Sequence, residues 1–166
     1  MKRIILFAFF TIFLFFGCSE KKDNSFDYGH VENNTYYNSY FDFEIDLIPE
    51  WHIQSREQTE RIANMGKNIA AGEDSTMQAA LKASEIKTAN LLAAFQHELG
   101  APVNYNPNIM IIAENLVDSP GVKNGSDYLF HAKKLLKNSQ IKYDYISEKF
   151  TKEKINNTDF HTMETN

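Results

Sequence analysis

The feature that most constrains this chain is an apolar run close to its N-terminus. Residues 4–16 are apolar with one exception, and Lys2 and Arg3 precede them. A helix of that length would measure about 20 Å, against a hydrocarbon core of about 30 Å, so it is too short to span a bilayer. The order of positive, apolar and small residues, ending at Gly17, is typical of a secretory signal. Residues 1–17 are therefore predicted to be a signal peptide, and the fold has to come from the rest of the chain.

The only cysteine of the chain follows this segment directly. The stretch Leu14-Phe15-Phe16-Gly17-Cys18 resembles the lipobox of bacterial lipoproteins. In that family the signal is removed before the cysteine, the thiol is joined to diacylglycerol, and the new N-terminus is acylated. The resemblance implies that Cys18 is the lipidation site and that covalent lipid holds the protein to a membrane. The alternative interpretation is an ordinary signal peptide with an incidental cysteine.

The residue after the cysteine bears on the destination of the protein. It is Ser19 rather than Asp. By analogy with enteric lipoproteins, this residue implies sorting to the outer membrane, with the domain on the periplasmic face or at the cell surface. A single cysteine also excludes a disulfide framework and a multi-cysteine zinc site.

The charge of the chain argues against nucleic acid as a partner. Removing Lys2 and Arg3 from the 17 basic residues leaves 15 against 22 acidic ones, a net charge of −7 after the signal. A surface that neutralises phosphates needs the opposite sign. We therefore expect no binding to nucleic acid.

Residues 18–35 differ in pattern from the residues that follow. They are polar and lack a sustained apolar period, so they are predicted to hold the lipidated cysteine and a flexible tether. Regular apolar patterns begin afterwards. Residues 36–166 are therefore predicted to form one folded domain.

Alternating apolar residues predict several strands in this domain. Phe41, Phe43, Ile45 and Leu47 alternate with polar neighbours, which is the period of a half-buried strand. Further extended segments are predicted at 51–53, 91–95, 109–116, 141–145, 148–155 and 160–165. The short links between them favour antiparallel pairing.

Three helices are predicted between these strands. The first starts at Ser55, which has capping-box spacing to Gln58, and carries an apolar stripe of Ile62, Met65 and Ile69. Ser75 is the expected start of the second helix. The third starts near Ser126, and we expect it to cover one face of the sheet with a single apolar face. That face comprises Tyr128, Leu129, Ala132, Leu135 and Leu136.

Together these segments predict an α+β fold with a mostly antiparallel sheet. The runs Tyr40-Phe41-Asp42-Phe43-Glu44-Ile45, Pro49-Glu50-Trp51 and Gly125-Ser126-Asp127-Tyr128-Leu129 resemble the PsbP/DcrB-like group over residues 36–166. The resemblance implies an α-β-α sandwich and an accessory role in envelope or membrane complexes. It implies no shared catalytic residues. The last strand runs into Asn166 without a turn, so two interpretations stay open, a chain incomplete at its C-terminus and a short edge strand.

Few residues suggest chemistry. The five histidines are scattered without a ligand pair, and we expect no metal ion, no cofactor and no enzymatic activity. Glu114 follows the apolar run 109–113 at a strand end, where catalytic acids can occur. The alternative to a lipid-anchored binding or accessory module with an unidentified envelope partner is therefore a small envelope hydrolase using Glu114 with a nearby His. That alternative requires a His or a second carboxylate within hydrogen-bond reach of Glu114.

Aromatic residues suggest a binding surface. Tyr36, Tyr37, Tyr40 and Phe41 are candidates for a binding patch. Packing of the alternating strand against a helix accounts better for Phe41, whereas the roles of Tyr36 and Tyr37 stay open.

Overall fold

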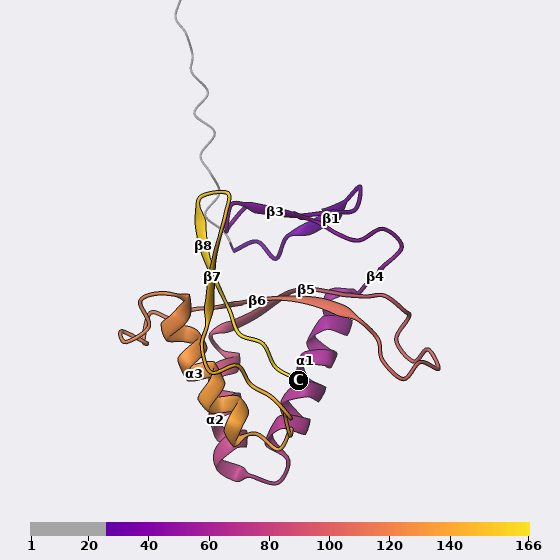
Figure 1. The fold of residues 1–166 in the computed structure, drawn as a ribbon. Coiled ribbons are helices and arrows are strands. Elements are labelled where there is room, and N and C mark those ends of the chain that lie inside the picture. The colour runs from indigo at the N-terminus through magenta and orange to yellow at the C-terminus, as the bar shows by residue number, and fades with distance from the viewer. Residues whose placement is uncertain (1–25) are drawn as a thin grey trace, which may run out of the picture.

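The computed structural model describes residues 26–166 and shows a mixed α+β fold (Figure 1). The described part contains three helices and three small sheets, and all strand pairs are antiparallel. The predicted fold class and pairing direction are confirmed at this level. Residues 1–17, which are predicted to be a signal peptide, and Cys18 lie outside the described residues.

The first sheet is made of β1 (His30–Glu32), β2 (Thr35–Asn38) and β3 (Phe43–Asp46), in that order. Asn33 and Asn34 join the first two strands and both have positive φ, 49° and 62°. Asparagine tolerates this conformation better than most residues, which explains the tight hairpin.

This sheet corrects part of the predicted tether. Residues 30–35, assigned to the tether over 18–35, contain β1 and the first residue of β2. Val31 lies opposite Tyr36 in the ladder and packs against the core. The prediction failed because a three-residue strand is too short to show a period. The domain therefore starts before residue 36.

The second sheet contains β4 (His52–Ile53), β5 (Thr88–Phe95) and β6 (Asn108–Glu114), with β5 in the centre. The register between β5 and β6 shifts between Asn90 and Leu92. Tyr36 from β2, Leu47 directly after β3 and Leu92 from β5 form the buried core cluster. The two sheets are therefore joined by apolar packing.

Two helices pack against β5. α1 (Arg56–Ala71) has the predicted capping box, in which the Ser55 side chain and Gln58 exchange hydrogen bonds with each other's backbone. α2 (Ser75–Glu85) is capped by Asp74, whose side chain accepts bonds from two backbone amides. The predicted cap at Ser75 is thus wrong by one residue.

The predicted apolar stripe of α1 is wrong for two of its three residues, because only Ile62 is half-buried. Met65 and Ile69 are each 63% exposed, whereas Thr59 and Ala71 are buried. Small side chains allow the close approach of α1 to β5 and α2, so the packed face is less apolar than the sequence stripe suggested. Met65 and Ile69 therefore lie on the surface.

The third helix, α3 (Gly125–Asn138), departs most from expectation. Asn124 caps it instead of Ser126, and none of its residues is buried. It lies beside the hairpin of β7 (Thr151–Ile155) and β8 (Thr158–Thr162), not against the face of a large sheet. The prediction that α3 covers one face of the sheet is wrong, because the helix packs on the narrow β7–β8 hairpin and only its first turn reaches the end of β6, through Tyr128 and Glu114.

The layers follow from these contacts. In Figure 1, β5 and β6 cross the middle of the molecule, β1–β3 lie above them, and the three helices lie below. This order differs from the α-β-α sandwich implied by the family resemblance, because a sheet occupies the place of one helical layer.

The segments after α3 were predicted less accurately. Residues 141–145 form no strand, although a single bridge joins Ile146 to Thr165. The strands predicted at 148–155 and 160–165 are shorter, at 151–155 and 158–162. Asn156 and Asn157 form the turn between them, both with positive φ.

Candidate functional site

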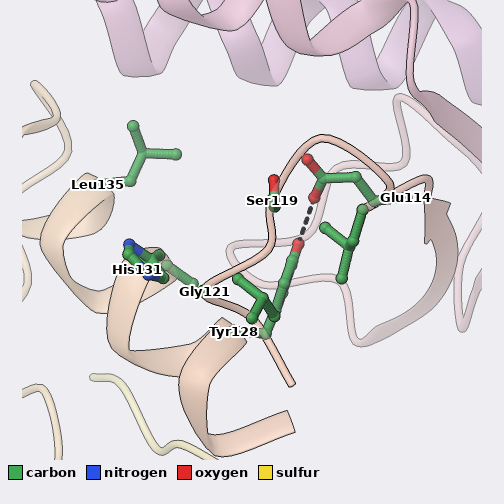
Figure 2. A pocket seen from close by; sticks show the side chains of 9 residues that line it. Glu114, Ser119, Gly121, Tyr128, His131 and Leu135 are labelled. Carbon is green, nitrogen blue, oxygen red and sulfur yellow. Dashed lines mark hydrogen bonds between the residues drawn. The ribbon is translucent and has the colours of Figure 1, made fainter. Parts of the chain in front are cut away.

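The end of β6, the start of α3 and the loop between them surround an open hollow of about 510 Å³ (Figure 2). Glu114 is the last residue of β6, and Tyr128 and His131 come from successive turns of α3. The lining residues are Glu114, Leu116, Ser119, Gly121, Val122, Tyr128, His131, Ala132 and Leu135. The hollow therefore contains the carboxylate that the sequence analysis selected.

Glu114 and Tyr128 form a hydrogen bond in this hollow. The Tyr128 hydroxyl donates to Oε2 of Glu114 at 2.8 Å, and Figure 2 shows the two side chains pointing toward each other. Partial burial of the ring raises the pKa of Tyr128 to about 12, and the hydrogen bond to Glu114 and its negative charge add to this rise. The phenol therefore keeps its proton at neutral pH. A tyrosine nucleophile or base would require the opposite shift.

The local sequence holds Tyr128 in place through the start of α3. The Asn124 side chain accepts a bond from the Asp127 amide at 3.1 Å, and Oδ2 of Asp127 accepts one from the Lys123 amide at 2.9 Å. These bonds fix the first turn of the helix against the preceding loop. His131 follows Tyr128 by three residues, so both side chains lie on the same side of α3.

The hydrolase hypothesis depended on a histidine or second carboxylate bonded to Glu114. Within residues 26–166, Glu114 is bonded to Tyr128 and to no histidine or carboxylate. His131 lines the same hollow, but its ring packs edge-on against Phe130, with the centroids 5.6 Å apart. The structure thus brings Glu114 together with a phenol instead of the expected imidazole.

A second hollow, of about 530 Å³, shares Glu114 and Leu116 with the first. We call five of its lining residues the aromatic patch: Phe26, Tyr28, Tyr40, Phe41 and Ile86. The ring centroid of Phe26 lies between 4.9 and 6.0 Å from those of the other three aromatic residues. Phe26 is 44%, Tyr40 50% and Ile86 91% exposed. Exposed large apolar side chains that gather at one hollow mark a candidate place for contact with a partner or a membrane.

Polar contacts hold the aromatic patch in shape. The Asp27 carboxylate accepts bonds from the Gly29 amide and from the amide and hydroxyl of Ser39, at 2.8–3.0 Å. These bonds, chiefly that from Gly29, lower the pKa of Asp27. The Arg56 guanidinium lies 3.7 Å from the centre of the Tyr28 ring, a cation–π contact. Residues 26–29 are therefore tied to the turn after β2 and to α1.

The four aromatic candidates from the sequence divide into two groups. Tyr36 is 1% exposed and belongs to the core, and Tyr37 stacks on His30 with the centroids 5.7 Å apart. Tyr40 and Phe41 are exposed and belong to the aromatic patch. The interpretation of Phe41 as a packed strand residue is wrong, because residues 39–42 form a turn and β3 starts at residue 43.

Three members of the aromatic patch were missed. Phe26 and Tyr28 fall in the predicted tether, and Ile86 follows the end of α2. The pair of aromatic residues in an otherwise polar stretch was a signal that could have moved the domain boundary toward residue 26. Ile86 has no such signal, because a single isoleucine after a helix is common.

The histidines remain apart, and Cys18 lies outside the described residues. His52 approaches Glu98 at 4.0 Å on the surface, and the backbone of His97 is bonded to Asn106. In the part of the chain from residue 26 onward, no group of three or more His, Cys, Asp or Glu side chains is arranged to hold a metal ion.

No described helix has both the length and the apolar character needed to cross a membrane. The chain matches no family model, and neither the curated proteins nor the solved structures include a significant match. The function therefore has to be argued from the residues themselves.

Proposed function

We propose that this protein is a lipid-anchored lipoprotein of the cell envelope that acts as a binding or accessory module. The observation that carries the proposal is the position of Cys18, the only cysteine, directly after an apolar segment and Gly17. The lipid on Cys18 attaches the domain to the membrane, at the outer membrane with the domain in the periplasm or at the cell surface. Confinement to the membrane raises the effective concentration of the domain near envelope proteins.

The described surface supports a binding role. The hollow at Glu114 offers exposed apolar area next to a fixed donor–acceptor pair. We assign no catalytic residue, because the hydrogen bond expected between Glu114 and a histidine is replaced by one from Tyr128. The partner in this proposal is an unidentified envelope protein.

Membership of the PsbP/DcrB-like group is also part of the proposal. It is supported by the sequence motifs and, at the level of fold class only, by the mixed α+β fold with antiparallel sheets, since the order of the layers differs from an α-β-α sandwich. Lipid-anchored accessory proteins are common in that group, which agrees with the proposed role of Cys18.

Labelling with a palmitate analogue tests the anchor. Cys18→Ser should abolish labelling of the full chain expressed in a lipoprotein-processing bacterium and leave the signal segment attached, because the thiol is where diacylglycerol would be joined. Ser19→Ala, next to the same position, should keep the label. Equal labelling of the wild type and Cys18→Ser would contradict the proposal, as would a wild type without label.

A further inference from the structure

We propose that the aromatic patch inserts into the lipid–water interface of the membrane that carries the anchor. This inference rests on the proposed lipid at Cys18. The patch thereby sets the orientation of the domain on the bilayer, with the lipid as tether and the aromatic residues as a second contact.

The side chains of the patch suit an interface between lipid and water. Phe26, Phe41 and Ile86 offer apolar groups, while Tyr28 and Tyr40 each combine an apolar ring with a hydroxyl. Amphipathic rings are enriched at the headgroup level of membranes for this reason. Ile86 is 91% exposed, so its insertion would remove apolar area from water without any rearrangement of the fold.

The chain length between anchor and patch favours the membrane as the partner. Phe26 follows Cys18 by eight positions in the sequence. Even fully extended, eight residues reach about 29 Å at most. The patch is therefore held within a short distance of the bilayer surface. Its effective concentration there is high, which favours even weak apolar contacts with lipid.

The charges around the patch form contacts within the domain and leave no excess of positive charge for anionic lipid. Lys87 lines the second hollow, and its Nζ lies 2.8 Å from Oδ2 of Asp118. The carboxylate of Glu114 accepts the bond from Tyr128, and Arg56 covers the Tyr28 ring. The Glu114 carboxylate keeps its negative charge, because the Tyr128 hydroxyl is an uncharged donor. Burial of apolar area, and not attraction to anionic lipid, would therefore drive the contact.

A tryptophan reporter with brominated lipids tests this contact. Trp51, the only tryptophan, is replaced by phenylalanine, and Phe41→Trp supplies a reporter inside the patch. The full-length lipidated chain is reconstituted into phosphatidylcholine vesicles that carry bromine on their acyl chains. Tyr105→Trp is the matched control, because Tyr105 is 76% exposed and lies in the loop at the opposite end of the β5–β6 pair. Quenching of Phe41→Trp should be several times that of Tyr105→Trp.

The possible outcomes distinguish a failure of the proposed lipid anchor from a failure of the proposed membrane contact. Weak or equal quenching at both reporters, with lipid on Cys18 verified by mass, would overturn the inference and leave the proposed anchor intact. A chain without lipid mass would overturn the proposed function, and the inference with it. Cross-linking of the patch to an envelope protein, without quenching, would assign this surface to a protein partner instead.

A second reporter guards against a damaged fold. If Phe41→Trp loses the native circular dichroism, Ile86→Trp takes its place, because the Ile86 side chain is almost fully exposed. In that background Tyr40→Ser should reduce quenching severalfold. Unchanged quenching after Tyr40→Ser would contradict a role of the patch.

Discussion

At the scale of single residues, the hydrogen-bonded pair of Tyr128 and Glu114 leads to a testable prediction about the pKa of Tyr128. The pKa of Tyr128 is raised to about 12 by burial and by the carboxylate of Glu114. Glu114→Gln removes the charge but not the burial, so the pKa of Tyr128 should fall only part of the way toward its ordinary value of 10.0. An NMR titration of ring-labelled tyrosine measures this pKa, with Tyr128→Phe to assign the signal. Glu153→Gln, on the exposed β7, should leave it unchanged.

The same pair also predicts how the stability of the fold changes with pH. Since the pKa of Tyr128 is higher in the folded state, the folded protein holds this proton more tightly than the unfolded chain does. The contribution is present below pH 10.0 and is lost as the pH rises to about 12. In denaturant melts, the free energy of unfolding should fall less over this pH range for Glu114→Gln than for the wild type. An identical loss in both proteins would contradict the assigned coupling.

The candidate site was only partly predictable from its residues. Glu114 was selected because it ends an apolar run, and this placement is confirmed. Its partner Tyr128 lies 14 residues later on another element, and no local pattern reports such a contact. The aromatic patch likewise joins Phe26 and Ile86, which come together only through the tertiary fold.

At the scale of elements, the start of α3 allows a test of which side chain caps the helix. Asn124 accepts a bond from the Asp127 amide, whereas Ser126, the residue expected from the sequence, lies inside the first turn. Asn124→Ala should lower the free energy of unfolding by about 1 kcal/mol. Ser126→Ala should change it by no more than about 0.5 kcal/mol. Chemical denaturation measures both, and a larger loss for Ser126→Ala would contradict the assigned cap.

The helices also show which features can be predicted from neighbouring residues in the sequence. The capping box at Ser55 and Gln58 involves neighbouring residues only, and the structure contains both of its bonds. The face that a helix buries depends on what lies opposite. Met65 and Ile69 in α1 and Leu135 in α3 look apolar enough to be core residues, yet they are exposed because no element covers them.

At the scale of the whole molecule, the sequence prediction and the structure differ in the residue at which the folded domain begins. A boundary at residue 36 would let a protease remove Phe26 and β1. In the structure Tyr36, 1% exposed, donates a hydrogen bond of 2.7 Å to the carbonyl of Tyr28, which ties the segment before β1 to the core. Asp27 adds three further bonds. The folded domain therefore includes residues 26–29.

Limited proteolysis of the full-length protein in detergent measures this boundary. The protected fragment should start no later than Phe26, because cleavage requires local opening and residues 26–29 are held by Asp27 and Tyr36. Asp27→Ala removes the three bonds to that carboxylate and should move the first cleavage toward β1. Glu44→Ala, an exposed carboxylate of β3, is the matched control and should leave the fragment unchanged. A wild-type fragment that starts near residue 36 would show that the segment before β2 is not held by these contacts. The aromatic patch would then lose Phe26 and Tyr28, and with them the surface on which membrane docking depends.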